Sequence, residues 1–176
     1  MPKAQSLKPK AEKRLPLGNR LPTDSARVAA LKMLARRELS ESQIRQRLVR
    51  RGHETADIEE AIVRLKNDRA IDDARVAGAI ARTETSVKRH GRLRVAQQMA
   101  RAGIAKSTAR AAITETFDSL DDDALLQQAL NRRLKNERPI ADQREFQRLY
   151  RYLIAQGFES DKVLEALTAR RRSREA

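Results

Sequence analysis

Arginine and lysine gather in two short stretches of this 176-residue chain. The first stretch holds six arginines within sixteen residues: Arg36, Arg37, Arg45, Arg47, Arg50 and Arg51. The second stretch surrounds Gly91 and holds Lys88, Arg89, Arg92, Arg94 and Arg101. A guanidinium presents a planar fork of donors that pairs with a phosphate or a carboxylate. Both stretches therefore indicate a surface for an anionic partner, and the alternative is a solvated helix face with internal ion pairs.

Two acidic runs, Asp72–Asp73 and Asp121–Asp123, invite a metal-site interpretation. Both stand where a helix is expected to begin, and carboxylates there accept hydrogen bonds from the first backbone N–H groups. We therefore assign Asp72 and Asp73 to helix capping, and we expect neither a metal nor a cofactor. The chain has no cysteine, and His53 and His90 lack a second histidine at a zinc-ligand spacing. We expect no enzyme, because catalysis would need an unseen site around the aspartate runs.

The basic stretches belong to a helical pattern that repeats three times. Gly52, Gly103 and Gly157 lie 51 and 54 residues apart, and apolar residues stand eight and four positions before each of them. That spacing places one apolar stripe on the helix before each glycine. Glycine adopts the left-handed conformation that closes a helix, so we expect all three to be helix caps. The motif predicts three packed pairs: His53 with Leu48, Ile104 with Met99, and Phe158 with Leu153.

A further helix precedes each of these helix pairs. Ser25 and Asp73, which stand 48 residues apart, both lead the letters Ala-Arg-Val-Ala. Ser40 with Gln43 has the spacing of a capping box. The expected helices span residues 24–37, 41–51 and 56–67, then 73–88, 92–102 and 108–117, then 122–136, 142–156 and 161–171. The chain is therefore expected to be all-α, with tandem three-helix modules of about 50 residues in an elongated, curved arrangement.

We expect the three modules to span residues 24–71, 72–119 and 120–168. Residues 1–23 hold four of the five prolines and form a basic tail that we expect to be disordered. Residues 169–176 form a second basic tail. No apolar run approaches the ~20 residues of a membrane helix, and no apolar segment follows the basic N-terminus as in a signal peptide. We expect a soluble, cytoplasmic monomer that does not contact a membrane.

The formal net charge of +14 favours a polyanionic partner. A helix that reads DNA bases in a three-helix unit carries Arg, Asn or Gln near its start. The expected third helices of the first and last modules start instead with acidic residues such as Asp57 and Asp161, which phosphates repel. Sequence-specific DNA reading is therefore disfavoured, whereas non-specific, salt-sensitive DNA binding is compatible with the composition.

Four fragments, taken in order, resemble the bacterial RecX regulatory proteins over residues 26–168. These fragments are Ala35–Ser40 followed by Ile44, Leu48 and Gly52; Ile71–Ala77; Gly91–Val95 with Met99, Gly103 and Ile104; and Leu153, Gly157 and Phe158 with Val163 and Leu167. Two positions depart from the family pattern, namely His53, where the family usually has Phe or Tyr, and Ala70, where a bulky residue is usual. The N-terminal tail lies outside the family pattern.

The resemblance implies a protein that binds the RecA–DNA filament in DNA repair and inhibits the recombination, ATPase and coprotease activities of RecA. Under this hypothesis we predict one main partner-facing set and one secondary set. The main set is Lys88, Arg89, Arg92 and Arg94, and the secondary set is Arg45, Arg47 and Arg50. The competing hypothesis is a nucleoid-type protein that coats DNA without specificity and needs no protein partner.

Overall fold

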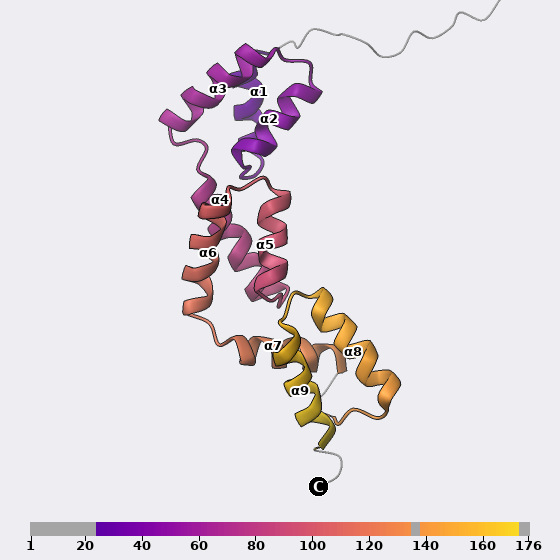
Figure 1. The fold of residues 1–176 in the computed structure, drawn as a ribbon. Helices are drawn as coiled ribbons and strands as arrows, with labels where there is room; N and C mark the ends of the chain where they lie inside the picture. Colours follow the sequence, from indigo (N-terminus) through magenta and orange to yellow (C-terminus); the bar gives the residue numbers. More distant parts are fainter. Residues whose placement is uncertain (1–23, 135–137, 173–176) are drawn as a thin grey trace, which may run out of the picture.

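The computed structural model describes residues 24–134 and 138–172 of the chain (Figure 1). The predicted disordered tail, residues 1–23, lies outside the described residues, as do residues 135–137 and 173–176. Within the described residues the protein is all-helical, which confirms the predicted fold class. The first four residues of the expected C-terminal tail, 169–172, continue the last helix.

Nine α-helices and one π-helical turn make up the described residues. Module 1 contains α1 (Ala26–Leu34), α2 (Glu41–Arg50) and α3 (Thr55–Asn67). Module 2 contains α4 (Asp73–Arg82), the π-turn η1 (Thr83–Val87), α5 (Arg92–Arg101) and α6 (Lys106–Asp118). Module 3 contains α7 (Asp122–Leu134), α8 (Gln143–Ala155) and α9 (Ser160–Arg172). Figure 1 shows the three modules following one another in single file, so the molecule is elongated.

The second helix of each module ends at a glycine, and the three ends have the same geometry. Gly52, Gly103 and Gly157 have φ angles of 82°, 72° and 88°, which L side chains rarely adopt. The residue after each glycine donates its backbone N–H to the carbonyl five positions earlier, at 3.0–3.3 Å. These bonds join His53 to Leu48, Ile104 to Met99 and Phe158 to Leu153. This pattern is the Schellman motif, so the second helix of each module ends in the same conformation.

The apolar side chains form two cores rather than three. Module 1 has its own core, in which Ile44, Leu48 and Ile58 are at most 1% exposed. Modules 2 and 3 share a single core that runs from Val76 to Leu167. The link from module 1 to module 2 consequently depends on polar contacts, whereas modules 2 and 3 are joined by buried apolar surface as well.

The π-turn is the clearest difference from the expected single helix over residues 73–88. In η1 the side chains of Glu84 and Thr85 are buried, and Thr85 Oγ1 donates to the Ala81 carbonyl at 2.9 Å. The Glu84 carboxylate accepts from Lys88 Nζ at 2.5 Å and pairs with His90 Nδ1 at 2.6 Å. The turn therefore ends the first helix of module 2 by turning a glutamate inward, where hydrogen bonds to Lys88 and His90 satisfy it.

Candidate anion-binding surface

Five arginines of module 1 surround one hollow on the protein surface. They come from the turn after α1 and from the second half of α2, and the hollow has a volume of about 540 Å³. The lining residues are Met33, Arg36, Arg37, Arg47, Arg50 and Arg51. No carboxylate of the described residues lies within 4 Å of any of these five guanidiniums, so none of them forms an ion pair there. We call this group the arginine hollow.

The arginine hollow holds its charges at an electrostatic cost. Burial, and then the positive charges of Arg37, Arg50 and Arg51, lower the pKa of Arg47 from its usual value. Like charges that converge without a counter-ion raise the free energy of the folded protein. An anion that enters the hollow relieves this repulsion and gains several guanidinium hydrogen bonds. The geometry therefore suits a phosphate or a carboxylate.

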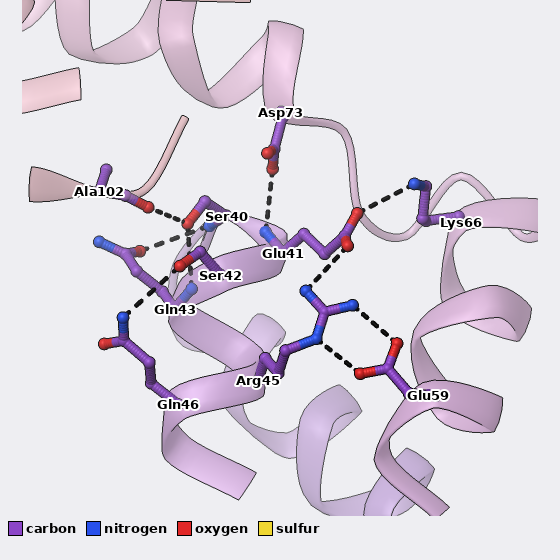
Figure 2. A network of polar contacts seen from close by, with 10 residues as sticks. All are labelled: Ser40, Glu41, Ser42, Gln43, Arg45, Gln46, Glu59, Lys66, Asp73 and Ala102. Carbon is purple, nitrogen blue, oxygen red and sulfur yellow. Dashed lines mark hydrogen bonds and ion pairs between the residues drawn. The ribbon is translucent and has the colours of Figure 1, made fainter. Parts of the chain in front are cut away.

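The sequence predicts that Arg45 faces the same partner as Arg47 and Arg50, but its side chain is engaged within the protein. Its guanidinium forms a two-pronged contact with Glu59 of α3, at 2.7 and 2.8 Å, and a third bond to Glu41 at 2.9 Å (Figure 2). Glu59 and Glu41 together raise the pKa of Arg45. Arg45 thus ties α2 to α3, and its charge is already balanced.

In module 2, Lys88 and Arg92 of the predicted main set also have internal carboxylate partners. Lys88 pairs with Glu84, and Arg92 Nε donates to Asp122 of module 3 at 3.0 Å. The guanidinium of Arg92 also lies over the ring of Phe117, 4.6 Å from its centroid. Arg92 thus connects α5 to α6 and α7, a structural role that the sequence does not reveal.

Arg94 and Arg89, the other two members of the main set, have no ion-pair partner among the described residues. Arg94 keeps a buried Nε without a hydrogen-bond partner in the described part of the chain. Arg89 has a φ of 61°, which is uncommon for a residue with a side chain. It lines a second hollow of about 600 Å³ with Val87, Gln128 and Arg132, so modules 2 and 3 both contribute to it. Two members of the predicted main set are therefore paired with carboxylates in the described residues, and two are not.

The predicted capping aspartates act at a module boundary. Asp72 is the N-cap of α4 and accepts from the Arg75 N–H at 3.0 Å. Asp73 reaches across to module 1 and accepts from the backbone N–H of Glu41 at 2.9 Å (Figure 2). In the same boundary the hydroxyl of Ser40 donates to the Ala102 carbonyl (Figure 2). The Asp73 contact holds the start of α4 against the start of α2, and the Ser40 contact holds the end of α5 there.

No three His, Asp or Glu side chains of residues 24–134 and 138–172 lie together in a way that could hold a metal ion. No helix in that part of the chain is long and apolar enough to cross a membrane.

Sequence reasoning places Arg36, Arg37 and Arg51 in the first basic stretch but does not include them in the partner-facing set. No local signal singles them out, because Arg37 and Arg45 both stand four positions from Glu41, yet in the described residues Glu41 pairs with Arg45 and not with Arg37.

Comparison with known proteins gives the same three-module division. Models of the first, second and third three-helix domains of RecX match residues 26–65, 72–113 and 121–167. The regulatory protein RecX of Halorhodospira halophila is 30% identical over 148 residues, covering 84% of this chain and 89% of that protein. The regulatory protein RecX of Acidithiobacillus ferrooxidans is 33% identical over 143 residues, covering 81% and 88%.

Two solved structures share the fold. A crystal structure of the regulatory protein RecX superposes with a TM-score of 0.68 at 24% identity, and covers 82% of this chain and 70% of that chain. The crystal structure of RecX from Lactobacillus salivarius gives a TM-score of 0.64 at 19% identity, with 82% and 95% covered. Both show the fold, and the sequence matches show the family. With all three of its modules matched in order, this chain belongs to the RecX family of regulatory proteins.

Proposed function

We propose that this protein inhibits the RecA recombinase by binding the RecA–DNA filament, and so lowers its recombination, ATPase and coprotease activities. Membership of a family of regulatory proteins supports a regulator. The observation that carries the proposal is the arginine hollow, which presents unbalanced positive charge on an elongated array of modules. Such an array is shaped to follow a long polyanionic assembly rather than to enclose a small molecule.

The arginine hollow makes the principal contact in this proposal. Arg47 and Arg50, from the predicted secondary set, act there together with Arg36, Arg37 and Arg51. Arg89 and Arg94 add contacts from module 2, because neither has a carboxylate partner in the described residues. Arg45, Lys88 and Arg92 act indirectly, because their internal ion pairs hold the helices in place.

The test measures DNA-stimulated ATP hydrolysis by RecA on single-stranded DNA, with this protein titrated far below the RecA concentration. A filament-directed regulator inhibits strongly at that ratio. The variant Arg47→Glu/Arg50→Glu is expected to lose the inhibition and keep its helical circular dichroism. Arg101→Glu/Arg110→Glu is the matched control, because it changes the net charge by the same amount. Both arginines are exposed, and neither forms an ion pair among the described residues. Equal inhibition by both variants would remove the arginine hollow from the contact.

A second candidate function is a nucleoid-type DNA-coating protein. The net charge of +14 favours it, because phosphates alone would satisfy the unpaired arginines. In that case RecA is inhibited only when enough protein is present to cover the DNA. The same titration therefore separates the two functions by the ratio of protein to DNA at half-inhibition.

A further inference from the structure

The two boundaries between modules use the same pair of surfaces. At each boundary the glycine end of one module's second helix meets the N-terminus of the second helix in the module before it. Gly103 lies so close to Ser42 that an added Cβ would overlap the serine side chain. Gly157 lies equally close to the backbone of Arg94. The array of modules therefore has a direction. A glycine helix end lies at its module 1 extremity, and a helix N-terminus lies at its module 3 extremity.

Hydrogen bonds fix both boundaries. The carbonyls of Gln156 and Gly157 accept from the N–H groups of Gly91 and Leu93, at 3.0 and 3.1 Å. The Ala102 carbonyl accepts from the Ser40 hydroxyl (Figure 2). Each glycine end therefore supplies carbonyl acceptors, and each helix start supplies N–H or O–H donors. This pairing satisfies the groups that helix ends leave without intrahelical partners.

The glycine end of module 1 has the same backbone geometry but no neighbouring module among the described residues. An added Cβ at Gly52 would meet nothing within 4 Å. His53 beside it is only 9% exposed, and no hydrogen bond to its ring is assigned among the described residues. Both residues line a hollow of about 580 Å³ whose other members include four acids, Asp24, Glu54, Asp57 and Glu60, and two arginines, Arg27 and Arg64. Asp24 pairs with Lys32 and Glu60 pairs with Arg64, so Glu54 and Asp57 are the acids of this end without an ion-pair partner among the described residues.

The opposite extremity of the array is the start of α8 in module 3. Ser40, Gly91 and Asp142 are the N-caps of the three second helices, and they stand 51 residues apart. Asp142 caps α8 through the Glu145 N–H at 2.7 Å, much as Ser40 caps α2 through the Gln43 N–H. Residues 141–144 are exposed in the described part of the chain. The exposed Arg144 adds a positive charge next to this capped helix start.

We propose that the start of α8 in one copy of this chain docks on the Gly52 end of a second copy. The contact repeats the boundary that the chain already makes twice within itself, and so extends the array head to tail. Arg144 of one copy meets Glu54 and Asp57 beside Gly52 of the other, which makes the two surfaces electrostatically complementary. Because the interface is heterologous, it leaves one free end of each kind and can add further copies.

A single boundary of this kind gives weak association between free molecules, so we expect the protein to stay monomeric in dilute solution. Copies held next to one another on a shared filament have a much higher effective concentration, on the order of 1 mM for closely tethered partners. There the end-to-end contact makes binding cooperative. The cooperative binding to the filament rests on the proposed function, whereas the docking of one copy on another does not.

The test uses the absence of cysteine from the chain. Glu54→Cys and Gln143→Cys place single thiols on the two exposed extremities, and a short bismaleimide joins thiols that come close together. We expect mixed dimers when the two variants are combined at high concentration, and none from either variant alone. Ala111→Cys, at an exposed position on α6, replaces Glu54→Cys in the control and gives no product with Gln143→Cys.

Adding Arg144→Glu to the Gln143→Cys chain is expected to lower the yield of mixed dimer about tenfold, the effect of losing one interfacial charge pair. Three results overturn the proposal: no mixed dimer, equal dimer from Glu54→Cys alone, or a yield that Arg144→Glu leaves unchanged. If no mixed dimer forms, the Gly52 end binds something other than a second copy, such as residues 1–23 or a different protein. RecA is absent from this experiment, so its failure leaves the proposed function untouched.

Discussion

Module 1 and module 2 each contain a dense basic stretch, but the two stretches differ in how many of their cations are paired with carboxylates among the described residues. In module 1, five arginines line one hollow and have no carboxylate partner among the described residues. In module 2, Lys88 is held by Glu84, and Arg92 is held by Asp122 and by the ring of Phe117. The number of cations in a stretch therefore says little about how many are available to a partner.

The difference arises from where the carboxylates stand. Glu84 precedes Lys88 by one helical turn, whereas Asp122 reaches Arg92 from another module. The arginine hollow forms where two chain segments end close together, with few acids on either of them. Cations near a helix C-terminus also interact favourably with the helix dipole, so part of the repulsion in the hollow is offset. The comparison predicts different consequences when charge is removed from the two modules.

The largest expected effect comes from reversing two charges in each module. Arg47→Glu/Arg50→Glu is expected to weaken binding to a single-stranded oligonucleotide about 100-fold, because two attractions are replaced by two repulsions. Arg92→Glu/Arg94→Glu should lower affinity less and stability more, because a glutamate at position 92 would face the carboxylate of Asp122. Fluorescence anisotropy and urea unfolding measure the two quantities. Similar affinity losses in both variants would end the distinction between the modules.

The second effect concerns Glu84, the buried carboxylate that pairs with Lys88 in module 2. Burial tends to raise the pKa of Glu84, but the hydrogen bonds from Lys88 and His90 outweigh it, so the pKa is lowered overall. A depressed folded-state pKa stabilises the protein above the unfolded value of about 4.5, and this stability is lost as the pH falls through the folded-state pKa. Glu84→Gln is expected to cost about 2 kcal/mol at pH 7.

Urea unfolding from pH 7 to pH 3 tests this effect. The wild-type protein should lose stability below about pH 4.5, and Glu84→Gln should lose less over the same interval, because its amide does not titrate. Glu59→Gln is the control in module 1, since Glu59 is an exposed partner of Arg45 and its loss should change stability little. Parallel curves for wild type and Glu84→Gln would show that Glu84 is not the titrating group.

Much of the fold follows from the sequence because its signals are local. The capping box of Ser40 and Gln43 and the helix ends at Gly52, Gly103 and Gly157 depend on residues within one or two turns. The π-turn at Thr83–Val87 does not follow from the sequence, because its apolar spacing resembles that of a continuing helix. What keeps it in place is the inward Glu84, whose partners Lys88 and His90 only converge in the folded chain.

The candidate site is harder to predict than the fold. Arg92 has no acidic neighbour one turn away, so its pairing with Asp122, thirty residues later, has no local signal. The Arg45–Glu59 contact joins two helices and is equally invisible to a spacing rule. Availability of a cation is a tertiary property, because it depends on which carboxylates the packing brings near. Sequence reasoning can name the basic stretches but cannot separate their paired members from the unpaired ones.

The third effect is a loss of stability at the boundary of modules 2 and 3. Arg92→Ala removes the contact with Asp122 and the stacking on Phe117, and is expected to cost about 1 kcal/mol. Oligonucleotide affinity should be nearly unchanged, because this guanidinium is already engaged. Arg92→Lys, which keeps the charge and removes the planar stacking, should recover part of the stability. A weakened affinity without a change in stability would instead assign Arg92 to the partner contact.

The smallest effect distinguishes two arginines that lie two residues apart on α2. Each phosphate of single-stranded DNA that a variant no longer neutralises reduces the slope of log affinity against log salt by about 0.7. Arg47→Gln should show this reduction, because Arg47 lines the arginine hollow and has no assigned carboxylate partner. Arg45→Gln should leave the slope unchanged, since Glu41 and Glu59 already neutralise Arg45. Equal slopes for the two variants would mean that engagement in ion pairs does not decide which arginines meet the phosphates.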